Sequence, residues 1–185
     1  VYQKMFQVSL EERDQVLKPL AQSGNEAVGS MGDDTPMAVL SSRERSLYDY
    51  FRQKFAQVTN PPIDPLREAI VMSLEVDLGG EANLFEETEA HARRTSLTSP
   101  VLSQGKFESI LALQESDLRV QIIDATYNPD NIDLQTALKN VCLEAAAHVV
   151  GGSNVLVISD RAFGETRVPM HSLLATGAIH HHLIE

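Results

Sequence analysis

Two aspartates that directly follow apolar runs are the first candidates for chemistry. Asp124 ends the run "VQIID", and Asp160 follows "NVLVIS". If both runs are parallel strands, both carboxylates lie at the carboxyl edge of a sheet, where they could act as general acid and base. The alternative is structural, with each aspartate accepting loop amides or pairing with Arg161 or Arg119. We favour the structural interpretation, because neither a nucleophile nor a phosphate-binding motif accompanies the two residues.

Histidines offer a second candidate, a metal site. His180, His181 and His182 are consecutive. Adjacent residues of a helix point about 100° apart, so three in a row cannot converge on one ion. Chelation from one helix needs i, i+4 spacing. Glu144 and His148 have that spacing inside an otherwise apolar helical pattern, which favours an ion pair or a solvated edge. We therefore expect no metal site.

Cys142 is the only cysteine, so it cannot form an internal disulfide. It lies in the middle of an apolar helical pattern, which favours a small core residue over a nucleophile. A lone cysteine fits a reducing compartment. We expect a cytoplasmic location, or a plastid if the source is a photosynthetic eukaryote.

Net charge argues against nucleic acid as a partner. The 185 residues carry a formal charge of −11, which repels a phosphate backbone. Gly29-Ser-Met-Gly32 has the GxxG form of some RNA-binding modules, but Asp33 and Asp34 follow it directly. We interpret the two glycines as turn residues. Because no run of 18 apolar residues is present, we also expect no membrane partner.

The elements that must position these residues divide the chain into a helical N-terminal part and a C-terminal part in which strands and helices alternate. A Ser9–Glu12 capping box opens a helix that ends near Ser23-Gly24, and an aromatic stripe predicts a second helix from about 46 to 57. The last third contains the apolar runs "DLRVQIIDATY" and "NVLVISDR", a long amphipathic helix between them, and a helix from Pro169 onward. We predict an α/β fold, with a helical N-terminal part followed by parallel β-α-β-α units.

The stretch "TNPPIDPLREAIVMSLEVDLGG" joins the two parts. Its prolines fix backbone φ angles and bias the preceding residues to extended geometry. Asp64 is a good N-cap and Pro65 a good first helical residue. The pattern predicts a helix that continues through Val76 and stops at Gly79.

Five segments together resemble a known family. They are "GSMGDDTPMAVLS", "YDYFRQKFAQVTNPPIDPLREAIVMSL", "SPVLS", "VISDR" and "LLATGAIHHHLIE". In this order they resemble the central domain of the glutamate synthase large subunit, over nearly the whole chain. Because the chain opens at Val1 and stops inside a helical pattern, we expect residues 1–185 to be one partial domain cut from a longer multidomain polypeptide.

The resemblance implies what surrounds such a domain. The family's large subunit has an N-terminal glutaminase domain and an FMN-binding domain with an iron–sulfur cluster. Ammonia from glutamine passes through a tunnel to the FMN domain and meets 2-oxoglutarate there. The resemblance implies that the central domain looks like an incomplete (β/α) barrel, binds no cofactor itself and helps to wall the tunnel. Its implied partners are the two neighbouring domains and, through the full enzyme, a small reductase subunit.

Ammonia must travel as a small neutral molecule, which calls for a narrow, rigid wall. A proline-fixed loop is suited to this, because locking φ lowers the entropy cost of rigidity. We therefore expect a tunnel-facing or interdomain surface, which comprises Thr59, Asn60, Pro61, Pro62 and Ile63. The alternative is that the loop only braces the two flanking helices.

Three functions remain in competition. The first is a connecting module of glutamate synthase, which would be non-catalytic by itself. The second is a free-standing α/β enzyme or small-molecule binder that uses Asp124 and Asp160. The third is a structural fragment without ligand contact. An exposed apolar surface favours the first, because partner domains normally cover such a surface.

Overall fold

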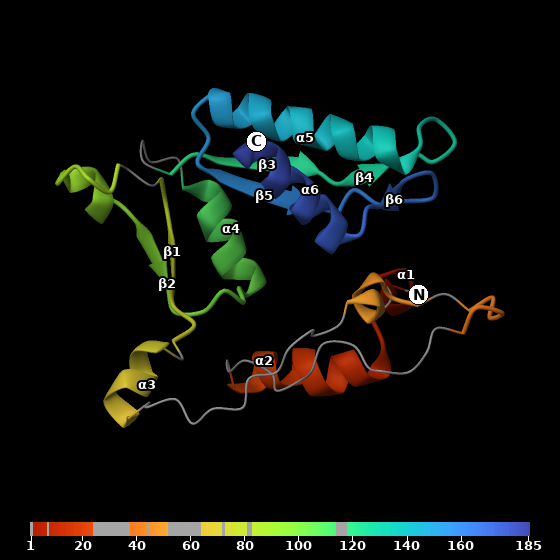
Figure 1. Ribbon diagram of the computed structural model, residues 1–185, viewed down its shortest axis with the longest axis horizontal. Coiled ribbons are helices and arrows are strands. Elements are labelled where there is room, and N and C mark those ends of the chain that lie inside the picture. The colour runs from red at the N-terminus through yellow and green to blue at the C-terminus, as the bar shows by residue number, and fades with distance from the viewer. Residues whose placement is uncertain are drawn as a thin grey trace. The chain divides into compact units, whose positions relative to one another are not determined.

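The computed structural model describes residues 2–6, 8–23, 38–43, 45–51, 64–71, 73–80, 83–113 and 118–185. The chain forms two compact units. The first comprises residues 1–75 with 98–101, and the second comprises residues 76–97 with 102–185 (Figure 1).

Short helical segments make up the described part of the first unit. They are α1 (Tyr2–Met5), the π-helical η1 (Glu12–Leu17), α2 (Lys18–Ser23), the 3-10 helix η2 (Leu47–Tyr50) and α3 (Pro65–Val71). The hydroxyl of Ser9 accepts a hydrogen bond of 3.0 Å from the Glu12 amide. The predicted cap at Ser9 and the predicted end near Ser23 are thus confirmed.

The predicted helix from 46 to 57 is wrong where the structure describes it. η2 ends at Tyr50, and Phe51 has extended backbone angles of φ −93° and ψ 136°. Tyr48, Tyr50 and Phe51 are 48%, 54% and 45% exposed. Most of the stability of a helix comes from packing of its apolar face. Because these aromatic side chains are exposed rather than packed, they do not stabilise the predicted helix of about 12 residues.

The predicted start of the next helix is confirmed, since an Asp64 carboxylate oxygen accepts the Arg67 amide at 2.8 Å ahead of α3. Its predicted continuation to Gly79 is wrong. The chain leaves the helix after Val71, and the Ser73 hydroxyl accepts the Glu75 amide at 3.1 Å. Such local side-chain bonds compete with helical hydrogen bonds.

The residues predicted as the end of that helix form a strand instead. β1 (Val76–Leu78) pairs antiparallel with β2 (Thr95–Leu97). The Ser96 hydroxyl donates to the Asp77 carboxylate across the pair at 2.6 Å. The 3-10 helix η3 (Glu89–Ala92) lies in the connection between the two strands. Long-range pairing with a partner some 20 residues later therefore overrides the local helical pattern.

The α/β part of the second unit confirms the predicted parallel units. β3 (Val120–Asp124) runs parallel to β5 (Val155–Ser159), with α5 (Leu134–Val150) between them and α6 (Ser172–Ile184) after them. The remaining elements are α4 (Gln104–Ala112) and an antiparallel pair of short strands, β4 (Thr126–Tyr127) and β6 (Val168–Pro169). The described strands form three separate two-stranded sheets, so the expected incomplete barrel is not found among them.

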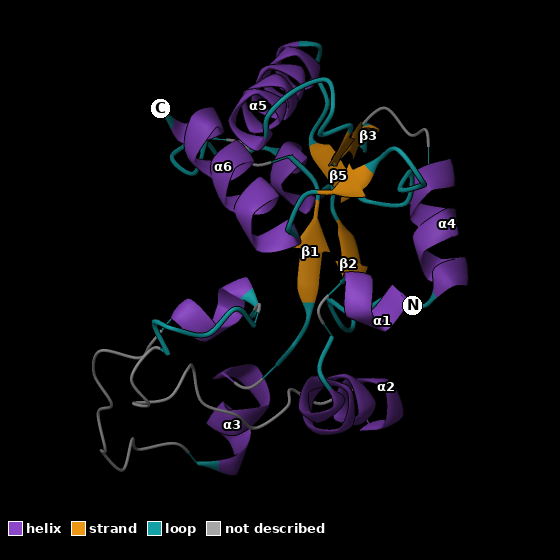
Figure 2. Cartoon of the chain, turned by 90° about the vertical axis from the view of Figure 1, so that its right-hand side faces the viewer, coloured by secondary structure: helices purple, strands orange, loops and turns teal. Residues whose placement is uncertain are grey.

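The core lies on one face of the β3–β5 sheet. Figure 2 shows α5 and α6 together on one side of these strands. Ile123 is fully buried, and Ala145 of α5 and Ala175 of α6 are buried with it. The small alanine side chains allow the two helices to pack closely on the sheet. The next strand residue towards the N-terminus, Ile122, points to the opposite face and is 51% exposed.

α5 is capped at both ends. An Asp133 carboxylate oxygen accepts the Thr136 amide at 2.7 Å at the first turn. At the other end Gly152 has a φ of +93°, and a Cβ there would lie 2.8 Å from Nη1 of Arg119. The Arg119 side chain could move aside, but the positive φ strains any residue with a Cβ and favours glycine at this turn. Hydrogen bonds from the side chain and the backbone amide of Thr136 hold the pKa of Asp133 below its ordinary value.

We expect Asp133→Ala to lower the thermal midpoint of the 185-residue chain at neutral pH. The pKa of Asp133 is depressed on folding, so its stabilisation is present above the unfolded pKa of about 3.9 and is lost as pH falls through the folded pKa. The gap between wild type and Asp133→Ala should thus shrink below about pH 4. Thermal melts followed by circular dichroism between neutral and acidic pH measure the difference in midpoint between the two proteins. Asp133→Asn serves as an uncharged capping control. An unchanged gap at low pH would contradict the charged cap.

Candidate functional site

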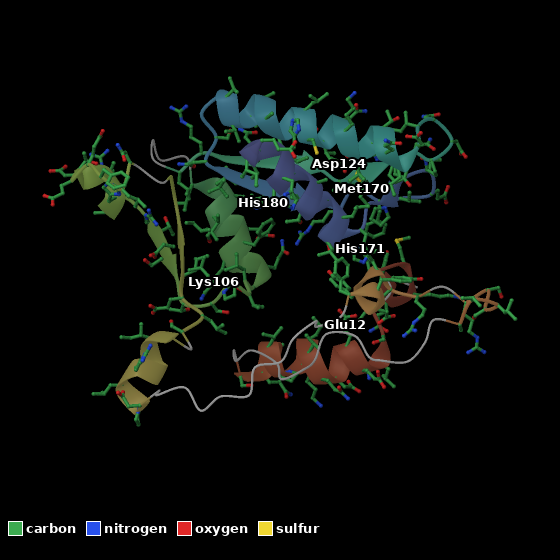
Figure 3. The ribbon with its side chains drawn as sticks, in the orientation of Figure 1. Glu12, Lys106, Asp124, Met170, His171 and His180 are labelled. Atoms are coloured by element: carbon green, nitrogen blue, oxygen red, sulfur yellow. The ribbon has the colours of Figure 1, made fainter. Side chains whose placement is uncertain are left out.

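Asp124 stands at the carboxyl end of β3 within a polar cluster of three side chains, Asp124, Thr126 and Arg167 (Figure 3 labels Asp124). One carboxylate oxygen of Asp124 accepts from the Thr126 amide at 3.0 Å and from the Thr126 hydroxyl at 2.7 Å. The other accepts from Nη2 of Arg167 at 2.5 Å. Both oxygens of Asp124 are therefore engaged by protein groups.

Arg167, the residue directly before β6, completes the cluster. Its Nε donates to the Thr126 hydroxyl at 2.8 Å, and its Nη2 also donates to the Thr126 carbonyl at 3.1 Å. Thr126 is buried, while the Asp124 and Arg167 side chains are 43% and 45% exposed. One guanidinium thus ties the end of β3 to the β4–β6 pair. The cluster is a structural clamp, which we call the Arg167 clamp.

Asp124 accepts a loop amide and pairs with an arginine, as the structural interpretation predicts, but this arginine was not among those predicted. The sequence suggested Arg161 or Arg119, whereas Arg167 is bound. Arg167 lies 43 residues from Asp124 along the chain, and no spacing or motif marks the pair. Only the antiparallel register of β4 with β6, in which Tyr127 pairs with Val168, brings the two residues together.

Asp160 is not paired with Asp124 in the parallel sheet. The register of the parallel strands places Ser159 opposite Asp124, so Asp160 lies one residue beyond the pairing. The neighbouring Arg161 donates to the Gln104 side-chain oxygen at 2.8 Å, and its guanidinium lies 5.2 Å from the centre of the Phe107 ring. Arg161 therefore fastens α4 to the loop after β5. The hydroxyl beside Asp124 is that of Thr126, which donates to Asp124 and accepts from Arg167, so both partners hold it in place.

Cys142 is buried in the core cluster, as predicted. Burial raises the pKa of its thiol above the ordinary value, which disfavours the reactive thiolate. The raised pKa leaves little of the Cys142 thiol as thiolate at neutral pH.

The histidines do not assemble a metal site within the described residues. His180 and His181 contact each other edge to face, with ring centroids 5.4 Å apart. The predicted pair of Glu144 and His148 is formed, with 3.7 Å between Nε2 and the carboxylate oxygen. Across the described ranges, no group of three or more His, Cys, Asp or Glu side chains is placed to hold a metal ion.

The residues of the expected tunnel-facing surface, Thr59 to Ile63, lie outside the described residues. Their nearest described neighbour is Asp64, the cap of α3. Among the described helices, none has the length and apolar character required to cross a bilayer.

A family model and several known proteins that match this chain all concern glutamate synthases. A family model described as glutamate synthase central domain matches residues 1–185. The chain is 45% identical over 189 residues to the chloroplastic ferredoxin-dependent glutamate synthase of Oryza sativa subsp. japonica, which covers 100% of this chain and 12% of that protein. It is 42% identical over 184 residues to the glutamate synthase (NADPH) large chain of Azospirillum brasilense, covering 98% of this chain and 12% of the relative. It is 41% identical over 184 residues to the glutamate synthase (NADH) of Schizosaccharomyces pombe, covering 97% and 9%.

Proposed function

The chain belongs to the glutamate synthase central-domain family, and from this premise we propose that it connects the glutaminase domain of a glutamate synthase to the FMN and iron–sulfur domain. It spans 9% to 12% of the length of the three relatives described above. The activity of a parent enzyme therefore resides largely in polypeptide outside these 185 residues. This chain contributes structure to that activity.

The proposed parent makes glutamate from glutamine and 2-oxoglutarate. Glutamine is hydrolysed to glutamate and ammonia, and the ammonia condenses with the keto group of 2-oxoglutarate with loss of water. Two electrons and two protons then give the second glutamate, with a reductant supplying the electrons through the FMN of the neighbouring domain. The residues of this chain do not fit an iron–sulfur cluster, because such clusters need about four cysteines and the sequence has one.

The observation that carries the proposal is the apolar surface of the second unit. Parallel sheets are normally covered on both faces, yet Ile122 of β3 is 51% exposed. On the outer side of α5, Leu143 is 53% exposed and Val150, seven residues on, is 89% exposed. These side chains lie on two separate faces, and neighbouring domains packed on those faces would cover them. Their exposure suits a domain that is enclosed by its neighbours in a longer chain.

The tunnel role rests on the segment from Thr59 to Ile63. We propose that its two prolines and its short polar residues, Thr59 and Asn60, line or frame the path of ammonia. A bracing role for the same loop remains the alternative.

Partners and location follow from the same proposal. The neighbouring domains of the same polypeptide are the main partners. A small reductase subunit is a further partner through the full enzyme, since the Azospirillum brasilense relative is named a large chain. We propose the cytoplasm as the location, or a plastid if the source is a photosynthetic eukaryote, since the Oryza sativa relative is chloroplastic.

The isolated chain tests the proposal directly. Incubated with glutamine, 2-oxoglutarate and a chemical reductant, it should hydrolyse no glutamine, form no glutamate and show no flavin absorbance. An enzyme that uses Asp124 is disfavoured, because both oxygens of that carboxylate are occupied by Thr126 and Arg167. A measurable glutaminase rate or a bound flavin would overturn the proposal. Asp124→Asn then serves as the control for any activity that is found.

A further inference from the structure

The connection between β1 and β2 presents two large apolar side chains to solvent. Leu84 is 82% exposed and Phe85 is 97% exposed. They stand side by side in a turn within residues 83–86 of the second unit. We call this pair the Leu84–Phe85 knob. A Phe side chain left so exposed is unfavourable in water unless another surface covers it.

Hydrogen bonds fix the turn that carries the knob. The Asn83 side-chain oxygen accepts the Phe85 amide at 3.1 Å, and the Asn83 side-chain nitrogen donates to the Glu86 carboxylate at 3.0 Å. The Glu86 amide donates to the Asn83 carbonyl at 3.0 Å. A ring nitrogen of His91 lies 2.7 Å from the Glu86 carbonyl. The turn is thus held in one shape, which lowers the entropy cost of inserting the knob into a pocket.

The surroundings of the knob are acidic. Glu86 and Glu87 follow it directly, Glu89 comes two residues later, and all three are exposed. The surface that receives it should therefore be an apolar pocket with a rim of lysine or arginine. A second copy of this chain is a poor match, because its net charge of −11 repels an acidic turn.

We propose that the Leu84–Phe85 knob docks into a basic-rimmed apolar pocket on another domain of the same polypeptide. The inference rests on the proposed function, in which this chain is one segment of a longer enzyme. The relatives support a partner in the same chain, because this segment spans only 9% to 12% of their length. A covalently attached domain faces the knob at high effective concentration, so a small contact suffices.

Photo-cross-linking in the full-length polypeptide tests the contact. The photoreactive residue p-benzoylphenylalanine replaces Phe85, and mass spectrometry locates the peptide to which it attaches after irradiation. We expect attachment to one peptide outside residues 1–185 that contains apolar residues and at least one lysine or arginine. The same residue at Thr166, which is exposed in a polar loop, should give only background attachment. Attachment only within residues 1–185, to a second copy, to a small subunit or to nothing would overturn the proposal.

Charge reversal gives a second, independent measurement. Glu87→Lys together with Glu89→Lys should lower the cross-linking yield at position 85, whereas Glu165→Lys should leave it unchanged. An unchanged yield in the double variant would contradict the basic rim. Cross-linking does not depend on ammonia transfer, so the outcomes separate cleanly. If the cross-link forms but ammonia does not pass along this chain, the tunnel role is refuted and the contact stands. If ammonia passes along this chain but no cross-link forms, only the contact is refuted.

Discussion

Replacing Ile123 with alanine should lower the free energy of unfolding of the α/β part by about 2–5 kcal/mol. The Ile123 side chain of β3 is fully buried in the core cluster with residues of α5 and α6. Truncating it to alanine leaves a cavity that these elements cannot close without losing contacts. Because the sequence contains no tryptophan, urea unfolding is followed by far-UV circular dichroism.

The neighbouring residue supplies a matched control for Ile123. Ile122 has the same side chain in the same strand, but it is 51% exposed on the opposite face. Ile122→Ala should cost about 1 kcal/mol or less in the isolated chain. Equal losses for the two variants would contradict the assignment of the core face. The proposed function has a neighbouring domain cover that face, so it predicts a larger cost of Ile122→Ala in the full-length polypeptide.

Removing the Arg167 clamp should have the second-largest effect. Arg167→Ala leaves the buried Thr126 hydroxyl without its guanidinium donor and Asp124 without its ion pair. The ion pair alone contributes about 0.2–1 kcal/mol, since both side chains are nearly half exposed and solvent screens them. With the hydrogen bonds to Thr126, we expect a loss of about 1–2 kcal/mol in urea unfolding.

A double-mutant cycle separates the clamp from general effects of substitution. Asp124→Ala and Arg167→Ala should cost together less than the sum of their separate costs, because each removes the same interaction. Arg167→Lys keeps the charge but lacks the planar fork, so it should restore only part of the loss. The account would be contradicted if Arg167→Lys restored the full stability, or if the costs of Asp124→Ala and Arg167→Ala were strictly additive. Either result would show that the guanidinium's hydrogen bonds to Thr126 and Asp124 are unimportant.

The parallel part of the fold could be predicted because its signals are local. The apolar runs around residues 120 and 155 and the long amphipathic pattern between them specify β3, α5 and β5 without knowledge of the rest. The segment after Val71 could not be assigned in this way. Its apolar spacing fits a helix, but β2 offers Val76 and Leu78 a partner strand that lies well beyond any local window.

The site shows the same division between local and long-range information. The sequence places Asp124 at the carboxyl end of a strand, and the structure agrees. It could not identify Arg167 as the partner, because the pairing depends on a register between β4 and β6 that no short motif encodes. The Leu84–Phe85 knob was likewise missed. Its exposure depends on how the turn around Asn83 folds rather than on the two residue types.

The central claim is that this chain helps to wall the path of ammonia in a glutamate synthase, and Thr59 tests it most directly. Full-length enzyme is given glutamine labelled with ¹⁵N in its amide, together with excess unlabelled ammonium. In the wild type, the glutamate formed from 2-oxoglutarate should retain the label, because the proposed path delivers ammonia without release to solvent. Thr59→Trp should lower both the label retained and the glutamate formed per glutamine hydrolysed, while Thr166→Trp leaves both unchanged. Retention at the wild-type level in Thr59→Trp would contradict the claim.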